Sequence, residues 1–280
     1  MKLLKKLYLQ PLVVILIALL ALSSCQPKDA DSPNPTEENP SDPVAPKVLL
    51  KKISNSPNDF QVFDYDEKGN IIKYTAQNTY RPDGAIHVLT QLFEYDSENR
   101  LSKVVSAYGY SKYFYKDNKV LEKIENYYTS NNQLLSTNFY TFNQKKQLVE
   151  TVEVIAKPIE DTPSQIKRTY QYDAKGNMTQ QAYLFLNKNN EFELSYTVFY
   201  EDYDDKKSID NLLFMYPYLP DTRFYENNYR RMKTVYPNGA VDEKVYLFEY
   251  QYNDKGFPIS KVQSIANRPD VISIRFEYAY

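Results

Sequence analysis

The stretch Phe63-Asp64-Tyr65-Asp66-Glu67-Lys68-Gly69-Asn70, followed by the apolar pair Ile71-Ile72, decides the fold of this 280-residue chain. An aromatic strand runs into a tight turn, and an apolar strand leaves it. The same frame returns in three further clear copies, at Phe93–Arg100, Tyr170–Asn177 and Tyr250–Gly256. A hairpin repeated along a chain predicts an antiparallel sheet in which neighbours in sequence are neighbours in space.

Each copy carries the residue types that a hairpin turn requires. The first turn position holds Asp or Asn, whose side chain can bond to the backbone two residues on and hold a type I turn. These residues are Asp66, Asp96, Asp173 and Asn253. Three residues later stands Gly or Asn, which accepts the positive φ of a closing bulge. These residues are Gly69, Asn99, Gly176 and Gly256. Two weaker copies have Lys146 and Lys207 at this position, which predicts strain there.

The segments beside the turns have strand patterns. Aromatic residues two positions apart precede the turns, a spacing that places both on one face of a strand. The pairs are Phe63/Tyr65, Phe93/Tyr95, Tyr113/Tyr115, Tyr140/Phe142, Tyr170/Tyr172, Tyr250/Tyr252 and Phe276/Tyr278. An apolar residue lies two positions past the bulge, at Ile71, Leu101, Leu148, Met178 and Ile209. The chain has 28 Tyr and no Trp, a bias that favours strands.

The spacing of the frames predicts the architecture. Tyr65 and Tyr95 lie 30 residues apart, an interval that accommodates two strands and two short turns. Turn residues of a second kind, such as Arg81–Gly84 and Pro237–Gly239, lie between the frames. We therefore predict an all-β domain over residues 47–280: one antiparallel meander of about 14–16 strands, curled into an open shell or half-barrel. The aromatic pairs should share the concave face, and the frame turns should share one rim, with Gly84 and Asn238 on the other.

Two other all-β shapes fit the pattern less well. A two-sheet sandwich would show cleaner alternation of apolar and polar residues than the strand Val88–Tyr95 does. An outer-membrane barrel would need a continuous apolar band facing the lipid. Charged residues instead occur at both alternating positions of the predicted strands, at Lys103, Lys123, Glu125, Glu150, Glu153, Lys167 and Glu193.

One segment departs from the repeat. Ser208–Asn228 includes the apolar run Leu212–Leu219 and two prolines, Pro217 and Pro220, which argue against a central strand. We expect a short helical turn and a loop that folds back over one end of the sheet. A cap on an exposed edge or mouth is favoured over a lip that binds a partner.

Residues 1–24 have the three parts of an export signal. Lys2, Lys5 and Lys6 form a basic start, and Leu12–Leu22 is an apolar run of eleven residues, too short to span a bilayer. The run ends in Leu22-Ser23-Ser24-Cys25, which resembles the lipobox of bacterial lipoproteins. The resemblance implies cleavage before Cys25 and lipidation of its thiol. Cys25 is the chain's only cysteine, so it cannot form an intramolecular disulfide.

Residues 25–46 are expected to be a disordered tether. They contain six prolines, no aromatic residue and five acids against one lysine, a composition that cannot offset the entropy of ordering. Gln26–Asp31 resembles the acidic export tag of some Gram-negative lipoproteins, which implies the outer surface; a plain linker and a periplasm-facing position stay open. Removing residues 1–24 lowers the formal charge from −2 to −5, and no basic patch with interleaved aromatics predicts nucleic acid as a partner.

The frames Tyr65-Asp66, Tyr95-Asp96 and Tyr172-Asp173 resemble the YD repeats of Rhs-type proteins. The series Tyr236–Gly239, Phe248–Tyr252 and Gly256–Pro258 is similar to uncharacterised YD-repeat-like lipoproteins of Gram-negative gut bacteria. The resemblance covers the chain after residue 47, and it implies an Rhs-like curled sheet and a lipid-anchored surface protein. It brings no catalytic residues. The lysines at the bulge positions and the shortened frame Tyr115–Asn118 depart from the pattern.

Residues that could carry chemistry are few. His87 is the only histidine, so neither a His-dependent triad nor a multi-His metal site has a second histidine to use. Asp64 and Asp66 begin like a calcium loop, but Lys68 and Thr75 stand where oxygen ligands belong. We assign no catalytic, cofactor-binding or metal-binding residue.

Two functions therefore stay open. The first is a non-enzymatic module that binds a glycan or a protein through its Tyr-rich sheet face, held in the outer membrane by the N-terminal lipid. The second is a glycan-acting hydrolase with a pair of carboxylates on the concave face. Cross-strand pairing for stability would by itself explain the regular tyrosines.

Overall fold

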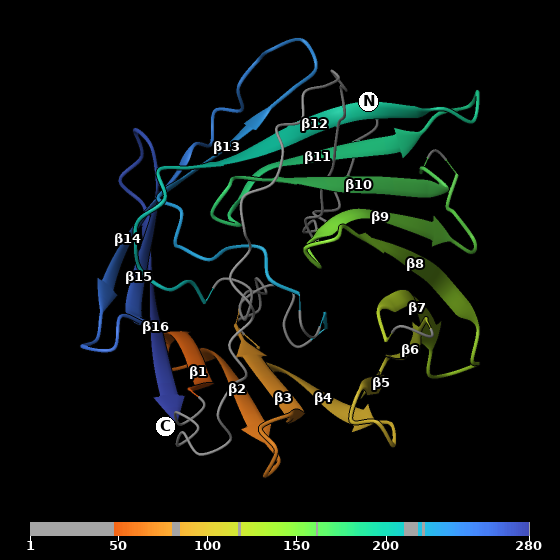
Figure 1. Ribbon diagram of the computed structural model, residues 1–280, viewed down its shortest axis with the longest axis horizontal. Coiled ribbons are helices and arrows are strands. Elements are labelled where there is room, and N and C mark those ends of the chain that lie inside the picture. Colours follow the sequence, from red (N-terminus) through yellow and green to blue (C-terminus); the bar gives the residue numbers. More distant parts are fainter. Residues whose placement is uncertain are drawn as a thin grey trace, which may run out of the picture.

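The computed structural model describes residues 48–79, 85–116, 119–160, 162–209, 218–219 and 222–279. Within these residues, sixteen antiparallel strands follow one another around a closed barrel, and β1 completes the ring by pairing with β16 (Figure 1). The strands are β1 (Leu49–Ser56), β2 (Asp59–Tyr65), β3 (Ile71–Asn78), β4 (His87–Tyr95), β5 (Leu101–Ser106), β6 (Gly109–Tyr115), β7 (Leu121–Tyr128), β8 (Leu134–Phe142), β9 (Leu148–Ile155), β10 (Gln165–Tyr172), β11 (Met178–Leu186), β12 (Phe192–Glu201), β13 (Arg231–Val235), β14 (Tyr246–Tyr252), β15 (Pro258–Ile265) and β16 (Val271–Ala279).

The all-β meander is confirmed, but the open shell is wrong because the sheet closes. The first and last strands pair from Leu49 with Ala279 to Ser54 with Arg275. Strand twist accumulates in a sheet of this size, and pairing its two edges satisfies backbone groups that would otherwise be exposed. The expectation that the tether leaves from an edge strand is wrong for the same reason, since β1 lies between β2 and β16.

The predicted turn chemistry is present in the frame turns. Asp66 N–H donates to Asn70 O at 2.9 Å, and Gly69 N–H donates to Asp66 O at 2.9 Å. The Asp66 carboxylate accepts from the backbone N–H groups of Lys68 and Asn70 at 2.9 and 2.8 Å. Asp96, Asp173 and Asn253 accept the same pair of bonds in their own turns. This side chain therefore holds each turn closed.

The bulge positions have positive φ. The angles are 76° at Gly69, 62° at Asn99, 94° at Gly176 and 79° at Gly256. Lys146 also has a φ of 60°, so one lysine copy accepts the unfavourable left-handed conformation. The assignment of Lys207 is wrong. No tight turn joins β12 to β13, and Lys207 instead forms an isolated bridge with Asn227. Gly84 lies outside the described residues.

The frame turns line one end of the barrel, which we call the frame rim. The turns β2–β3, β4–β5, β8–β9, β10–β11 and β14–β15 belong to it, and Asn238, between β13 and β14, lies on the opposite rim. Strand direction also brings Leu49, at the start of β1, and Ala279, at the end of β16, to the frame rim, where they pair.

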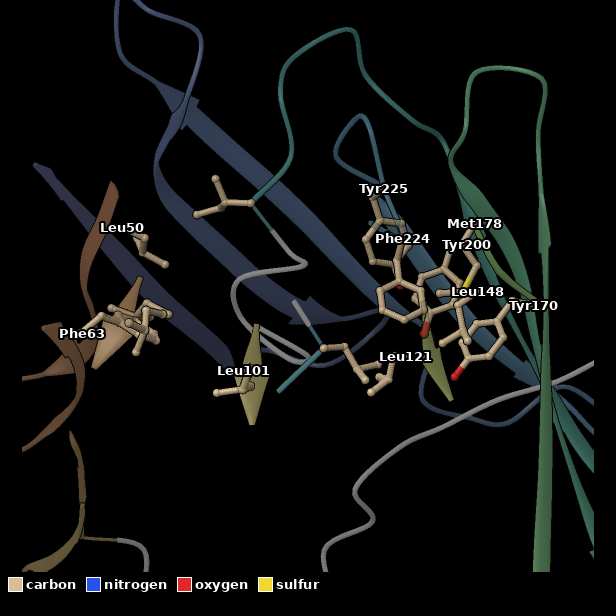
Figure 2. Packing of buried hydrophobic residues seen from close by; sticks show 14 of the residues in the cluster. Leu50, Phe63, Leu101, Leu121, Leu148, Tyr170, Met178, Tyr200, Phe224 and Tyr225 are labelled. Carbon is tan, nitrogen blue, oxygen red and sulfur yellow. The ribbon is translucent and has the colours of Figure 1, made fainter. Parts of the chain in front are cut away.

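The aromatic pairs turn inward, as predicted, and form the core. Phe63, Phe93 and Tyr170 are all less than 7 % exposed, and their partners Tyr65, Tyr95 and Tyr172 pack against the same cluster, as does Tyr250 of the pair Tyr250/Tyr252. The apolar residues that follow the turns complete the layer, with Leu148 fully buried. Figure 2 shows Leu148, Met178 and Tyr170 packed near one another inside the wall. Burial of this apolar surface is the main force that stabilises the barrel.

Tyrosine hydroxyls join neighbouring hairpins at the frame rim. Pairing between hairpins stops short of the rim: β3 and β4, for example, pair only as far as Lys73 and Leu92. Beyond that point the Tyr95 hydroxyl donates to Ile71 O at 2.8 Å. Equivalent bonds of 2.5–2.9 Å, which we call tyrosine clasps, join Tyr65 to Leu50, Tyr115 to Leu101, Tyr172 to Leu148, Tyr203 to Met178 and Tyr278 to Pro258. The frame tyrosines therefore have a structural role.

The outward face carries charged residues that form ion pairs. Lys103 lies 3.2 Å from Glu94 on the adjacent strand, and Lys167 lies 2.7 Å from Glu150. Similar pairs occur elsewhere around the wall: Lys52–Glu277, Lys73–Asp64, Lys123–Glu125 and Lys233–Glu201. The interior of the barrel is thus mainly aromatic, and its outer face carries charges beside exposed apolar residues such as Leu92 and Phe139.

The described parts of the segment that joins β12 to β13, residues 202–209, 218–219 and 222–230, pack inside the barrel, and we call them the plug. Ile209, Leu219, Phe224 and Tyr229 are each at most 3 % exposed. In Figure 1 the coloured parts of this segment lie within the ring of strands. The expected loop over one end of the sheet is therefore an inserted plug at the frame rim. The expected helical turn falls largely on residues 210–217, which lie outside the described residues.

Ring contacts and hydrogen bonds fix the plug to the wall. The rings of Phe224 and Tyr170 lie 5.3 Å apart, as do those of Tyr225 and Tyr200 (Figure 2). Met178 N–H donates to Phe224 O at 2.7 Å. On the far side of the barrel, the Tyr218 hydroxyl donates to Gln91 of β4.

Candidate binding site at the frame rim

The barrel wall has a slot between β9 and β10 at the frame rim. Their ladder ends at the pair Thr169–Glu150, and beyond it the strands separate. A cavity of about 610 Å³ occupies this place. Amide, hydroxyl and charged side chains line it together: Asn143, Gln144, Lys145, Gln147, Val149, Tyr170, Gln171, Tyr172 and Asp173. The Tyr172 clasp to Leu148 O, 2.9 Å long, bridges the two strands beside the slot.

A smaller groove of about 320 Å³ continues from the slot across the rim to the plug. It shares Lys145, Gln147 and Asp173 with the slot, and Arg223 and Glu226 of the plug form its far wall. Four cationic side chains face two acidic ones here: Lys145, Lys146, Lys175 and Arg223 against Asp173 and Glu226. The groove therefore has a net positive charge.

Asn177 holds the plug against this groove. Its side chain is completely buried, and its amide oxygen accepts from the backbone N–H groups of Glu226 and Asn227 at 2.9 and 2.8 Å. Its amide nitrogen donates to Asp173 at 3.2 Å. Asn177 thus connects the turn Asp173–Asn177, which lines the groove, to the plug.

A buried ion pair lies on the inward face of the same strands. Arg168 of β10 donates to Glu153 of β9 at 2.5 Å, and the Arg168 side chain is 9 % exposed. The guanidinium also lies 5.9 Å from the ring centroid of Tyr183. Removing either partner would leave an uncompensated charge in the barrel.

Burial raises the pKa of the Tyr170 and Tyr172 hydroxyls above the ordinary value for tyrosine. The low-dielectric surroundings disfavour the phenolate, so both hydroxyls stay neutral at physiological pH. The Tyr172 hydroxyl donates to Leu148 O, and the slot presents neutral amide groups next to cations.

The sequence-predicted residues separate into two groups at this site. Asp173 and Gly176 belong to it, while Asp66, Gly69, Asp96, Asn99, Asn253 and Gly256 hold other frame turns. His87 lies on β4, with Nε2 buried and without a hydrogen-bond partner in the described structure. Cys25 lies outside the described residues. The turn that contains Lys146 was predicted as a weaker copy of the frame, but its part in a site was not predicted; its lysines were the available signal.

Two inward carboxylates have structural partners. Glu153 is neutralised by Arg168, and Asp204 accepts from the backbone N–H groups of Lys206 and Asn228 and from the Tyr252 hydroxyl. In the described part of the chain, no group of three or more His, Cys, Asp or Glu side chains is placed to hold a metal ion. Nor do these residues include a helix that is long and apolar enough to cross a membrane.

Comparison with known proteins supports the fold. No protein-family model matches the chain, and no curated protein matches it.

The barrel is similar to a porin-like protein from Bacteroides uniformis, with 11 % identity, a TM-score of 0.53 and coverage of 83 % of this chain and 96 % of that one. A porin-like protein from Bacteroides vulgatus gives 15 % identity, a TM-score of 0.41 and coverage of 82 % and 99 %. The TcdB2-TccC3 structure gives 12 % identity, a TM-score of 0.24 and coverage of 76 % and 12 %. The shared property is a distant β-rich fold, and the finer resemblance to YD repeats stays a prediction.

Proposed function

We propose that this chain is a lipid-anchored protein of the outer membrane, displayed at the cell surface, whose barrel lies in water and binds a saccharide without catalysing a reaction. Cys25 carries the lipid, and residues 25–46 connect it to the barrel. A periplasm-facing position of the same anchored barrel is the alternative topology.

The observation that carries the proposal is the polarity of the wall. A barrel embedded in lipid needs an apolar outer band. Here the outer face carries ion pairs such as Lys103–Glu94 and Lys167–Glu150, while the inner face is aromatic. Charges on a lipid-facing surface would cost several kcal/mol each near the middle of a bilayer. This polarity supports a barrel held beside the membrane by its lipid.

The slot supports binding of a saccharide. Asn143, Gln144, Gln147 and Gln171 supply amides, each with donors and an acceptor, which match the hydroxyl groups of a sugar. The half-buried Tyr172 adds an aromatic ring of the kind that packs against sugar rings, next to the buried Tyr170. Tyr172 also packs against the core and donates its clasp to Leu148 O, so the slot is lined mainly by amides, with one edge of the Tyr-rich face beside them.

The proposed tether would join the barrel at the end that carries the slot. The first described strand begins at Leu49, on the frame rim, where it pairs with Ala279. A tether leaving from this rim keeps the slot near the membrane surface and the polymers attached to it. Tethering raises the effective concentration of such ligands.

The anchor is tested by mass spectrometry of the chain extracted from its host membrane. We expect cleavage before Cys25 and a diacylglyceryl group on its thiol, and we expect Cys25→Ser to release the chain from the membrane. An unmodified Cys25, or a chain that retains residues 1–24, would contradict the anchor.

Binding is tested with the detergent-extracted full chain on a saccharide array. The matched variants are Gln171→Ala, in the slot, and Gln251→Ala, at the same frame position between Tyr250 and Tyr252. We expect binding that Gln171→Ala weakens and Gln251→Ala leaves unchanged. An array without any bound saccharide, or equal losses in the two variants, would contradict the proposed function.

A further inference from the structure

We infer that the slot and the groove select an acidic saccharide, a chain that contains uronic-acid residues; this inference rests on the proposed function and assigns its ligand class. The slot would hold sugar rings through its amides and the half-buried ring of Tyr172. The groove beside it would bind the carboxylate of a neighbouring residue. The inference depends on charge that is confined to one sector of the frame rim.

The turn Asn143–Gln147 supplies this charge. It contains Lys145 and Lys146 and no acid, whereas Asp66–Asn70 contains two acids and one lysine. In the turn Asp96–Arg100, Arg100 is neutralised by Asp96 at 2.7 Å and Glu98 at 3.5 Å. Among these three turns, only Asn143–Gln147 has lysines without an acid in the same turn.

The acids of the groove neutralise only part of this charge. Asp173 accepts hydrogen bonds within its own turn from Lys175 N–H, Asn177 N–H and the Asn177 amide. Glu226 lies 3.8 Å from Arg223, and both are well exposed, at 48 % and 75 % of their side-chain surface. Lys145, Lys146 and Lys175 are exposed on the remaining sides of the groove. An anion that enters would meet cations from the two turns and from the plug.

The two cavities have the dimensions of a short chain rather than a single ion. About 610 Å³ in the slot adjoins about 320 Å³ in the groove, and Lys145, Gln147 and Asp173 line both. One sugar would therefore lie among the amides of the slot, and the next sugar would lie among the cations of the groove. Because the lysines are exposed, each contact should contribute modestly and should weaken with salt.

The experiment is calorimetric titration of the detergent-extracted full chain with four probes: tri-galacturonic acid, a neutral galactose trisaccharide, inorganic phosphate and glycerol phosphate. The variant is Lys145→Gln, and the matched control is Lys255→Gln, which changes the same frame position in the turn Asn253–Phe257. We expect tri-galacturonic acid to bind at least tenfold more tightly than the neutral trisaccharide. Lys145→Gln should weaken it about fivefold, as loss of one exposed charge contact implies. Lys255→Gln should have no effect.

The alternative outcomes separate the two proposals. Equal binding of the acidic and neutral trisaccharides, unaffected by Lys145→Gln, would overturn the selection of acids and leave saccharide binding intact. Binding of neither trisaccharide would overturn both. Tighter, Lys145-dependent binding of glycerol phosphate would assign the groove to a lipid phosphate headgroup and overturn the inference. Equal responses to phosphate and tri-galacturonic acid would show adventitious anion binding and would also overturn it.

Discussion

The barrel wall and the plug are built in different ways. In the wall, one hairpin chemistry is repeated, and each hairpin contacts the next through a ladder and a tyrosine clasp such as Tyr95 to Ile71 O. The plug occurs once and contacts residues far away in sequence: Tyr218 reaches Gln91, 127 positions earlier. Repetition distributes the stability of the wall over many equivalent contacts, whereas the plug concentrates burial in a few residues. The largest effects of substitution should therefore occur at the plug.

Truncation of Tyr229 is the most severe test of this difference. Tyr229 is 2 % exposed, and its ring lies 4.9 Å from Tyr200 and 5.1 Å from Phe248. Tyr229→Ala should lower the free energy of unfolding by about 3 kcal/mol, because it removes a buried ring and leaves a cavity. The control, Phe139→Ala, truncates an aromatic ring that is 44 % exposed on the outer wall, and it should cost less than about 1 kcal/mol. Denaturant melts of the full chain that give equal losses would contradict the distinction.

The same difference explains what could be predicted from the sequence. The turns were predictable because Asp173 and Gly176 fix a local conformation whose partners lie within four residues. The inward aromatics followed from the two-residue period. Closure was not predictable, because pairing of Leu49 with Ala279 joins the two ends of the domain and leaves no local signal.

The plug and the candidate site depended on contacts between distant segments. The apolar run Leu212–Leu219 indicated burial, but the sequence did not distinguish a cap on the barrel from insertion into it. The Arg168–Glu153 pair was also hidden, since Glu153 counted only as one of several scattered charges. The slot arises where a ladder ends at Thr169, and no residue type marks that point. Lys145 and Lys146 were visible as exceptions to the frame, but their shared groove with Arg223 was not.

Asparagines at one frame position allow a sharper comparison. Asn177 and Asn70 both follow the bulge glycine and both donate to the turn aspartate. Only Asn177 also accepts from Glu226 and Asn227 N–H of the plug. Asn177→Ala should therefore cost about 2 kcal/mol, because it leaves buried N–H groups unsatisfied, while Asn70→Ala should cost less than about 1 kcal/mol. Equal costs in thermal melts would mean that Asn177 does not hold the plug.

Substitutions at two bulge glycines also test the contact between a frame turn and the plug. Gly176 and Gly256 have φ of 94° and 79°, so a β-branched residue is strained at either position. At Gly176 an added Cβ would also lie 3.2 Å from Glu226 Cγ, whereas at Gly256 it would meet nothing within 4 Å. We expect Gly176→Val to destabilise by about 1–2 kcal/mol and Gly256→Val by the smaller part of that range. If denaturant melts give a smaller loss of unfolding free energy for Gly176→Val than for Gly256→Val, the contact with Glu226 does not destabilise the variant.

The smallest expected effect concerns a gap in the ring of clasps. Phe142 occupies the frame position held by Tyr95, Tyr115 and Tyr172, and Leu121 on the preceding strand occupies the position of Leu101 and Leu148. Phe142→Tyr should add a hydroxyl that donates to Leu121 O and should stabilise the barrel by about 0.5–1 kcal/mol.

The reverse substitution, Tyr95→Phe, should remove an existing clasp and cost about 1 kcal/mol, because Ile71 O would lose its donor. Both variants keep the aromatic ring, so their difference isolates the hydroxyl from core packing. Thermal melts of the full chain measure both shifts. Opposite signs would establish the clasp as the bond that closes the wall between hairpins. No change in Tyr95→Phe would mean that ring packing alone holds the hairpins together at this rim.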